Sequence, residues 1–548
     1  MPKNLADEVD VRRIARSFDH YQNDLDANQQ EKQVQCNLLL DGGGPSSTNY
    51  EGWSLKAKLI GRLKQFCERT SSHGVPWLGS APNLAYRSIW LSLCTFCFVL
   101  FSLQAHNLLQ KYYKKEKITS IQLNVDSAPF PAITICNLNP YLLTSIRHIG
   151  SAQKILQTYK SVLAKVKNHQ NGQNQQYLSD DDEQTILEAL GFNNMTDEVA
   201  IVTKARENII FAMSALAEEN RMLVSTQKHQ LIHKCSFNGQ ACNIDKDFKF
   251  TSDPSFGNCF TFNHNTSDPK FSARAGATYG LRLLAYVNTT EYLPITEAVG
   301  VRITIHDPDE YPFPETSGYS APTGFVSSFG VKLTRLSRLP EPYGKCVPDG
   351  STKEYLYQGF QYSLEGCYRT CLQKMAIERC GCGDPRFPVF DADYCQVFDP
   401  EASKLILRSK NDALPGQCLE EVSDGLGAEN SQGSAVSCQC AQPCKQPSYT
   451  VSYSCANWPS ESLNISVGKC ELEAAKCNEY YQDNGAMIEV FYEALNYEVL
   501  TEYEAYGLVK MMADLGGQLG LWSGVSVITC CEVIFLFFEL IHLFIYKN

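Results

Sequence analysis

The sequence predicts an α+β membrane protein in which two transmembrane helices flank a large, disulfide-rich extracellular domain. Three observations support this prediction. Apolar residues gather in two windows, 89–107 and 512–546, each long enough to cross about 30 Å of hydrocarbon as a helix. Of the 23 cysteines, 17 lie between these windows. Four Asn-x-Ser/Thr sequons lie there too, at Asn194, Asn265, Asn288 and Asn464, and we expect them to be glycosylated.

The cysteines and sequons also predict the orientation. Cysteines at this density indicate disulfides made in the secretory pathway, which places residues 108–511 outside the cell and both termini in the cytoplasm. The first window begins too far from Met1 for a cleaved signal peptide, so it should remain as an anchor. Lysines on its outer flank, at 111, 114, 115 and 117, oppose the positive-inside rule. Long domains translocate largely regardless of flanking charge, so we expect a multi-pass plasma-membrane protein.

The cytoplasmic region is predicted to be residues 1–88. Its first 50 residues are polar and typical of a disordered tail, and residues 52–67 have the pattern of a basic amphipathic helix on the inner leaflet. A turn at 72–76 precedes the first span. At the other end, residues 547–548 form a minimal cytoplasmic tail.

Between the spans, strand-like and helix-like segments alternate. Residues 130–137, 298–306 and 488–496 are strand candidates, and residues 151–232 have helical spacing. We expect a strand after the first span and one before the second to join both helices to one sheet. From Cys346 to Cys477 there are 13 cysteines, whose pairing the sequence leaves open. Because 17 is odd, at least one cysteine of this domain should be unpaired or bonded elsewhere.

The second window carries an unusual glycine and carboxylate pattern. Gly516, Gly520 and Gly524 are spaced by four, so on a continuous helix they share a face that permits close helix packing. Glu532 and Glu539 are seven apart and also share a face. A carboxylate at mid-bilayer depth costs at least about 2.5–3.5 kcal/mol, so it is tolerated chiefly where it faces water or a partner. In a symmetric oligomer each of these two glutamates would form a ring of carboxylates, as in cation pathways. Glu539 lies nearer the membrane interface, so snorkelling of its side chain to the interface is an alternative explanation for its position.

The segment Gly524-Val525-Ser526 is predicted to be a selectivity filter. Gly weakens a helix and Ser supplies a hydroxyl, and non-helical backbone at membrane depth is allowed only where it lines water or is buried in protein. Exposed carbonyl oxygens at such a break replace the hydration shell of a small cation.

These residues resemble the degenerin/epithelial sodium channel superfamily, and its degenerin branch in particular. Each motif alone is weak, but together, in this order and spacing, they are specific. They are the Gly-x-Ser filter at 524–526, His73-Gly74, the segment 130–137, the stretch 339–346, Gly-Cys-Gly-Asp-Pro at 381–385, residues 485–492 and the run 512–526.

The resemblance implies a homo- or heterotrimer with a hand-like extracellular domain of palm, β-ball, finger, knuckle and thumb. It implies an amiloride-sensitive channel that conducts sodium as the permeant ion, with no cofactor and no metal. By position, Ala513 matches the site where bulky substitutions lock channels open, Gly520 the amiloride site in the outer pore, and Glu532 the acidic ring. Tyr343 matches the wrist aromatic that couples the thumb to the first span, and His73-Gly74 a gating motif.

Two departures qualify the resemblance. Acid-sensing members carry histidines just after the first span, whereas this chain has lysines at 114, 115 and 117, which argues against activation by protons. The chain also stops at Asn548, without the proline- and tyrosine-containing tail of epithelial members, so we expect cytoplasmic coupling to rest on residues 1–88.

We expect a channel of a neuronal or sensory cell, gated by force, ligand or pH, or constitutively open. A two-span adhesion or receptor protein without a pore remains an alternative, and an ATP-gated trimer would need a basic cluster that we do not find. No catalytic motif, phosphate loop or basic nucleic-acid stripe is present, and disulfides explain the cysteines better than zinc. Expected partners are membrane lipid, like or related subunits, and extracellular matrix, peptide or accessory membrane proteins.

Overall fold

The computed structural model describes residues 55–125, 128–170, 181–348, 354–389, 391–395, 415–424, 438–460, 462 and 474–545. The predictions for residues 1–54, for Asn464 and for residues 547–548 lie outside these ranges. The chain divides into two compact units. We call Met1–Gln110 with Val509–Asn548 the helical unit, and Lys111–Leu508 the sheet unit.

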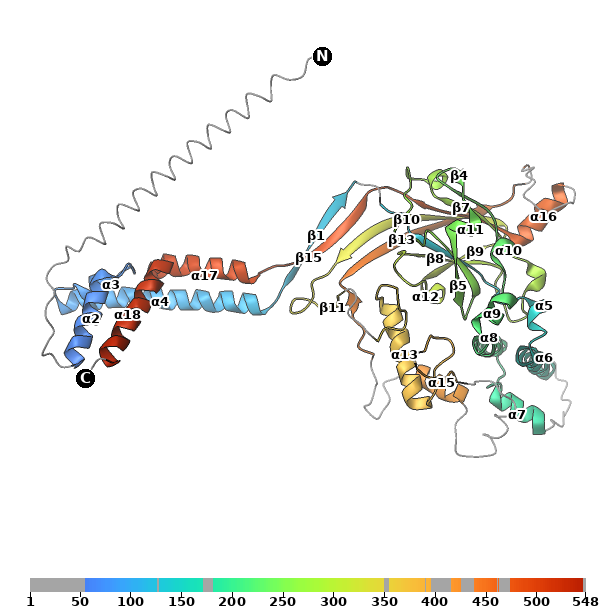
Figure 1. Ribbon diagram of the computed structural model, residues 1–548, viewed down its shortest axis with the longest axis horizontal. Coiled ribbons are helices and arrows are strands. Elements are labelled where there is room, and N and C mark those ends of the chain that lie inside the picture. Colours follow the sequence, from blue (N-terminus) through green and yellow to red (C-terminus); the bar gives the residue numbers. More distant parts are fainter. Residues whose placement is uncertain are drawn as a thin grey trace, which may run out of the picture. The chain divides into compact units, whose positions relative to one another are not determined.

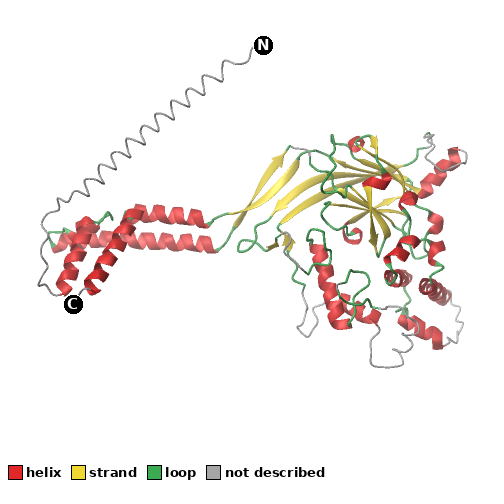
Figure 2. Ribbon diagram, in the orientation of Figure 1, coloured by secondary structure: helices red, strands yellow, loops and turns green. Residues whose placement is uncertain are grey.

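The helical unit contains the apolar windows (Figures 1 and 2). One uninterrupted helix, α4, has no Gly, Pro or acidic residue and is long and apolar enough to cross a membrane. Two shorter helices, α17 and α18, meet at a bend of 75° and pass the same test only as a pair, so the described residues hold one such span or two. The helices are α2 (Leu55–Arg69), α3 (Val75–Gly79), α4 (Leu84–Tyr113), α17 (Leu508–Ser523) and α18 (Val527–Ile545).

The break between α17 and α18 corrects one prediction. Gly516 and Gly520 lie on α17, but Gly524 lies beyond its end with a φ of +62°, in the left-handed region. The three glycines therefore do not share one face of a continuous helix, because the helix ends before the third. The predicted non-helical backbone at residues 524–526 is present.

The sheet unit contains two large sheets over a common apolar core. The first has the order β1-β15-β10-β14-β7-β3-β4, and β13 pairs with β10 off this path. Its strands are β1 (Lys117–Asn124), β3 (Ile232–Phe237), β4 (Gln240–Ala241), β7 (Leu281–Tyr286), β10 (Phe325–Ser337), β13 (Lys445–Asn457), β14 (Gly485–Tyr492) and β15 (Tyr497–Glu504).

The second sheet has the order β5-β6-β2-β8-β9. Its central strands are buried along their length because both faces are covered, which explains their β-branched and aromatic composition. The strands are β2 (Ala132–Asn137), β5 (Phe248–Asp253), β6 (Gly257–Phe262), β8 (Gly300–His306) and β9 (Gly318–Pro322). A separate short pair joins β11 (Cys346–Val347) and β12 (Gln442–Pro443).

The strands that join the two spans differ from those predicted. The candidates at 130–137 and 488–496 form strands, but β2 lies in the five-stranded sheet and β14 in the eight-stranded one. Instead β1 follows α4 directly and β15 directly precedes α17, and the two pair antiparallel from Lys117↔Glu504 to Asn124↔Tyr497. β1 is largely exposed and β15 is mostly half-buried, and neither has a fully buried residue, so they lack the buried apolar run that marks the other strands.

The predicted helices at 151–232 are confirmed, with a second apolar core of their own. The stretch 200–223 is two helices rather than one, separated at residues 215–217. These helices are α5 (Leu143–Ile146), α6 (Gly150–Gln170), α7 (Asp181–Ala189), α8 (Glu198–Ser214), α9 (Glu218–Val224) and α10 (Lys228–Leu231). The others in the unit are α11 (Ile244–Asp247), η1 (Ala277–Tyr279), η2 (Thr289–Glu291), α12 (Pro314–Ser317), α13 (Leu364–Cys380), α15 (Pro415–Asp424) and α16 (Ala474–Asn484).

The disulfide framework is also confirmed. Seven bonds join described cysteines, and five of them lie in the predicted cysteine-rich block. Cys477 is disulfide-bonded as well, whereas Cys455 on β13 is free and exposed, in line with the odd count. The seven pairs are Cys136–Cys259, Cys235–Cys242, Cys346–Cys444, Cys367–Cys440, Cys371–Cys438, Cys380–Cys418 and Cys382–Cys395.

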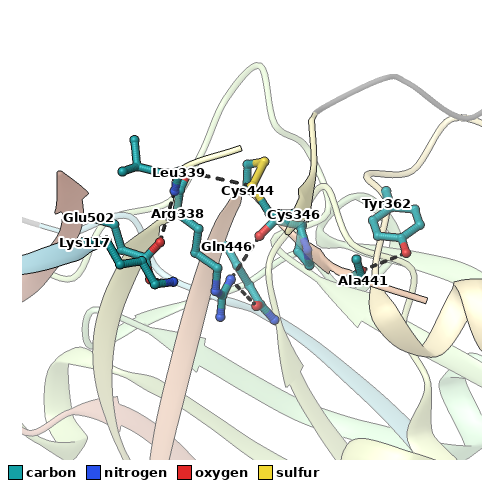
Figure 3. The surroundings of a disulfide bond; sticks show 10 residues. Lys117, Arg338, Leu339, Cys346, Tyr362, Ala441, Cys444, Gln446 and Glu502 are labelled. Carbon is teal, nitrogen blue, oxygen red and sulfur yellow. Dashed lines mark hydrogen bonds and ion pairs between the residues drawn. A yellow bond between two sulfur atoms is a disulfide. The ribbon is translucent and has the colours of Figure 1, made fainter. Parts of the chain in front are cut away.

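One of these bonds ties the cysteine-rich block to the strands that continue into the spans. Figure 3 shows the Cys346–Cys444 bond beside Arg338, whose guanidinium donates to the Pro443 carbonyl at 3.0 Å. In the next residue, the Leu339 amide donates to the Glu502 carboxylate at 3.1 Å, and Lys117 donates to the same carboxylate at 2.6 Å. The block, β15 and β1 are thus connected through consecutive polar contacts.

Candidate ion pathway

The conformation at Gly524 requires glycine for two reasons. Its φ of +62° strains any residue with a Cβ, and a Cβ built there would overlap the imidazole of His73. Its amide donates to the Gly520 carbonyl at 2.9 Å and closes the last turn of α17. The chain then runs non-helically to Val527, where α18 begins.

The His73-Gly74 motif holds this break from the N-terminal side. The His73 amide and the Ser72 hydroxyl both donate to the Ser523 carbonyl, each at 3.0 Å. Gly74 adopts a φ of +82° at the start of α3, and a Cβ there would lie 2.6 Å from Cys94 Sγ on α4. The structure therefore brings together two predicted motifs that are about 450 residues apart in the sequence.

Ser526 acts first as a helix cap. Its amide donates to the Thr529 hydroxyl at 3.1 Å, and the Thr529 amide donates to the Ser526 hydroxyl at 3.4 Å. This reciprocal pair satisfies donors at the start of α18 that would otherwise lack partners. The Ser71 hydroxyl lies 2.7 Å from that of Thr529, so the N-terminal segment also supports the far side of the break.

Two backbone carbonyl groups at the break remain available. The Ser523 oxygen accepts two hydrogen bonds, and the Ser526 oxygen accepts one from the Cys530 amide at 3.0 Å. Within the described parts of the chain, the oxygens of Gly524 and Val525 accept none. These two oxygens are the groups at the break that can replace water around a cation.

The two carboxylates of α18 line one cavity of about 270 Å³ against α2, so the predicted shared face is confirmed. Glu532 accepts hydrogen bonds from the Thr70 hydroxyl at 2.9 Å and the Ser71 amide at 3.0 Å. Glu539 lies 3.8 Å from the guanidinium of Arg62. The hydrogen-bond donors to Glu532 are neutral, whereas Arg62 lies close enough to Glu539 to offset part of its charge. Arg62 and Arg69 both line the cavity that the two carboxylates share.

The remaining predicted pore positions lie on α17. Ala513 is exposed, and a Cβ at Gly520 would meet only the Val525 oxygen, 3.9 Å away. The indole of Trp522 donates to the Gln104 amide oxygen of α4 at 2.8 Å, which fixes α17 against the uninterrupted helix. The roles of Ala513 and Gly520 stay predictions.

In the sheet unit, Tyr343 lies in a cluster with the lysines that follow α4. The Lys115 ammonium lies 3.4 Å from the ring centre of Tyr112 and 5.0 Å from that of Tyr343. The Tyr343 hydroxyl bonds the Glu504 carboxylate, and this bond, with burial, raises the pKa of Tyr343 to about 12. The stretch 339–346 is thereby attached to both strands of the β1–β15 pair, at the end where Lys117 faces Glu504. A role in coupling stays a prediction.

The described sequon asparagines, Asn194, Asn265 and Asn288, are all exposed. Sequence reasoning missed the hydroxyl residues Thr70, Ser71, Ser72 and Thr529, which make most of the contacts around the break. The signal available was the Thr-Ser-Ser run directly before His73.

An apolar span broken at unbonded carbonyl oxygens, with a carboxylate below the break, defines a class of protein: a membrane ion-channel subunit. Comparison with known proteins leads to the particular family. Residues 66–536 match the family described as "Amiloride-sensitive sodium channel". The chain therefore belongs to the degenerin/epithelial sodium channel family, which consists of ion channels and not of enzymes.

Several degenerins are similar over most of the chain. Degenerin mec-10 of Caenorhabditis elegans is 42% identical, over 98% of this chain and 92% of its own length. Degenerin mec-4 of Caenorhabditis briggsae is 36% identical, over 93% of this chain and 89% of its own. Degenerin deg-1 of Caenorhabditis elegans is 46% identical over 65% of this chain and 45% of its own. These matches place the chain in the degenerin branch.

Proposed function

We propose that the chain is a subunit of a sodium-selective, amiloride-sensitive channel, assembled as a trimer with copies of itself or related subunits. In this proposal the sheet unit is extracellular, both termini are cytoplasmic, and the channel lies in the plasma membrane. Family membership supports the class of channel. The sheet unit corresponds to the hand-like domain, with the 150–231 helices as finger and α13 and α15 as thumb.

The observation that carries the proposal is the break at Gly524-Val525-Ser526. Its two unbonded carbonyl oxygens lie between a helix end and a helix start that the N-terminal segment holds in place. Three copies around an axis would present six such oxygens, enough to replace the hydration shell of a small cation. Backbone held by several hydrogen bonds keeps a constant aperture, as selection of sodium requires.

Below the break, Glu532 is the better candidate of the two acidic positions. Its hydrogen-bond donors, Thr70 and Ser71, are neutral, so three copies would attract cations more strongly than carboxylates held in ion pairs. Glu539 has Arg62 as a counter-charge, so its contribution to the local field is smaller. We infer an acidic ring at Glu532 and a secondary role for Glu539.

Gating is proposed to pass through the β1–β15 pair. The pair continues at one end into α4 and α17, and the Tyr343 cluster attaches it to the cysteine-rich block. Displacement of the extracellular domain would then move both helices at once. Two lysines after α4 are already engaged, Lys115 with a tyrosine ring and Lys117 with a carboxylate, which favours force or a ligand over protons as the stimulus.

A pair of glycine variants tests the function. Expressed in oocytes, alone and with a degenerin relative, the chain should carry an amiloride-blocked current that disappears when sodium is replaced by a large organic cation. Gly524→Ala should change the sodium to potassium permeability ratio or abolish the current. Gly516→Ala is the matched control, because a Cβ there meets nothing within 4 Å.

The alternative, an adhesion or receptor protein without a pore, predicts a different result. Under that alternative, neither variant changes any current, and the wild-type chain carries none with or without a relative. That outcome, with the protein present at the surface, would contradict the proposal.

A further inference from the structure

A cavity of about 340 Å³ in the sheet unit lies away from the ion pathway, where β7, η2 and α16 meet. One wall is aromatic. The rings of Tyr286, at the end of β7, and Tyr480, on α16, are 5.6 Å apart and tilted by 31°, and their hydroxyls bond each other. The His233 ring lies 5.0 Å from that of Tyr286. Three separate elements thus contribute aromatic rings to the lining of one cavity.

The polar groups of this cavity include an acceptor and a donor. Glu291 accepts from the Thr144 amide and hydroxyl with one carboxylate oxygen, at 3.0 and 2.8 Å. Gln230 accepts from the Gln227 amide at 2.9 Å with its oxygen. The other oxygen of Glu291 and the side-chain nitrogen of Gln230 have no partner among the described residues.

Aromatic rings combined with a free acceptor and a free donor match the chemistry of a sugar. A pyranose ring has an apolar face that packs on aromatic rings and hydroxyls that bond polar groups at its edge. No lysine or arginine lines the cavity among the described residues, which disfavours a phosphate or carboxylate ligand.

Asn288 also lines the cavity and begins the sequon Asn288-Thr289-Thr290. Its oxygen accepts from the Thr290 hydroxyl at 2.8 Å and from the Thr290 amide at 3.4 Å. Its side-chain nitrogen, the atom that carries an N-linked glycan, donates to none of the described residues. A sugar attached there is held beside the cavity at an effective concentration of roughly millimolar or more.

We propose that Asn288 carries an N-linked glycan whose first sugars fold back into this cavity and pack on Tyr286 and Tyr480. The lipid-linked oligosaccharide diphosphate of the secretory pathway supplies the sugar. The Asn288 nitrogen bonds the anomeric carbon, the bond from that carbon to the diphosphate breaks, and the amide proton leaves with the diphosphate. The inference rests on the extracellular placement of the sheet unit in the proposed function.

The glycan has a structural consequence. It contacts η2 through its attachment, β7 through Tyr286 and α16 through Tyr480. It thus adds to a junction that the chain itself forms through the tyrosine pair, Asn484 and an apolar cluster containing Leu284 and Tyr481. The Asn484 oxygen accepts from the Thr289 amide at 3.0 Å at the same junction.

The test uses the full-length chain from animal cells, with Asn265 as the matched control site because its own loop is exposed. Release of each glycan by a peptide N-glycosidase is followed site by site by mass spectrometry, on folded and on denatured protein. On folded protein, release at Asn288 should be about tenfold slower than at Asn265, which corresponds to about 1.4 kcal/mol of packing. After denaturation the two rates should be equal.

A variant of the cavity wall distinguishes packing of the glycan on the tyrosines from general steric hindrance of the glycosidase. Tyr480→Ala should bring the release rate at Asn288 up to that at Asn265, and Thr290→Ser, which keeps the sequon and the hydroxyl, should leave the protection intact. Equal rates in the folded wild-type chain, or protection that survives Tyr480→Ala, would overturn the proposal. The proposal would also be overturned if Asn265 carried a glycan and Asn288 did not. Absence of a glycan at both sites would instead contradict the extracellular placement of the sheet unit.

Discussion

Single residues of the break have roles that depend on atoms far away in the sequence. Gly524 must be glycine because of both its φ and the His73 ring, and Ser526 caps α18 while its neighbours leave their oxygens unbonded. The residue types of the filter were therefore predictable, whereas the partners that hold it were not. Hydroxyl residues such as Ser71 and Thr529 are too common on helices for their type alone to indicate this arrangement.

Glu532 gives the first prediction at this scale. Replacing Glu532 with Gln keeps the acceptor for Thr70 and Ser71 but removes the charge, so unitary sodium conductance should fall by roughly a factor of two. Glu539→Gln is the matched control and should have a smaller effect, because Arg62 already offsets its charge. Single-channel recording measures both, and unaltered current in Glu532→Gln would place that carboxylate off the pathway.

Glu310 gives a prediction for pH. Burial, with the nearby Asp307 charge, raises the pKa of Glu310 to about 7, from about 4.3 in an unfolded chain. The folded state thus binds this proton more tightly, so stability is greatest below about pH 4 and declines as pH rises through 7. The loss from this one group is about 4 kcal/mol at most.

The measurement is the thermal unfolding midpoint of the detergent-solubilised chain between pH 5 and pH 8. Glu310→Gln should flatten the decline with rising pH, while Glu219→Gln, at an exposed position, should keep the wild-type profile. An identical decline in both variants would show that Glu310 does not titrate in this range.

At the scale of elements, β1 and β15 decide how α4 and α17 are connected. Their pairing is not evident in the sequence because none of their residues is fully buried, and a strand without a buried face carries only a weak periodic signal. By contrast, β2 and β8 were recognised because they are buried along their length, which selects β-branched residues. Burial selects the apolar and β-branched residues by which a strand is recognised in a sequence. The β1–β15 pairing lies at the surface, so the sequence predicts it least well.

Tyr343 tests that connection. Tyr343→Ala removes a cation–π contact with Lys115 and a hydrogen bond to Glu504, so we expect a shift of roughly fivefold in the open–closed equilibrium. Tyr343→Phe keeps the ring and loses only the hydrogen bond, so its shift should be smaller. Macroscopic open probability measures both. If the two variants behave like the wild type, coupling does not pass through this cluster.

At the scale of the whole molecule, a pore position that is exposed in the single chain can contact neighbouring subunits in the assembled channel. Ala513 is exposed in the single chain, so nothing described in the chain itself opposes a larger side chain there. Ala513→Val should nevertheless raise the resting sodium current, because in a trimer the added methyl groups meet neighbouring subunits near the outer mouth. Met512→Val, at the adjacent exposed position, should not. An unchanged leak in Ala513→Val would contradict the assignment of this position.

Orientation of the whole chain can be tested at Cys455. This exposed free thiol lies in the sheet unit, so a membrane-impermeant maleimide applied to intact cells should label the wild-type chain. Labelling should fall in Cys455→Ser, while channel assembly should persist because no described disulfide uses that residue. Labelling that requires permeabilised cells would place the sheet unit in the cytoplasm.

The sequence by itself determined the class of protein, the disulfide-rich middle, the position of the helix break and the shared face of Glu532 and Glu539. Each of these follows from local chemistry: apolar length, cysteine number, glycine at a helix end and helical spacing. Only the tertiary structure decided that residues 70–74 support the break, that β1 pairs with β15, and that Asn288 borders an aromatic cavity. These depend on contacts between residues hundreds of positions apart, and exposed polar groups carry no pattern that specifies such partners.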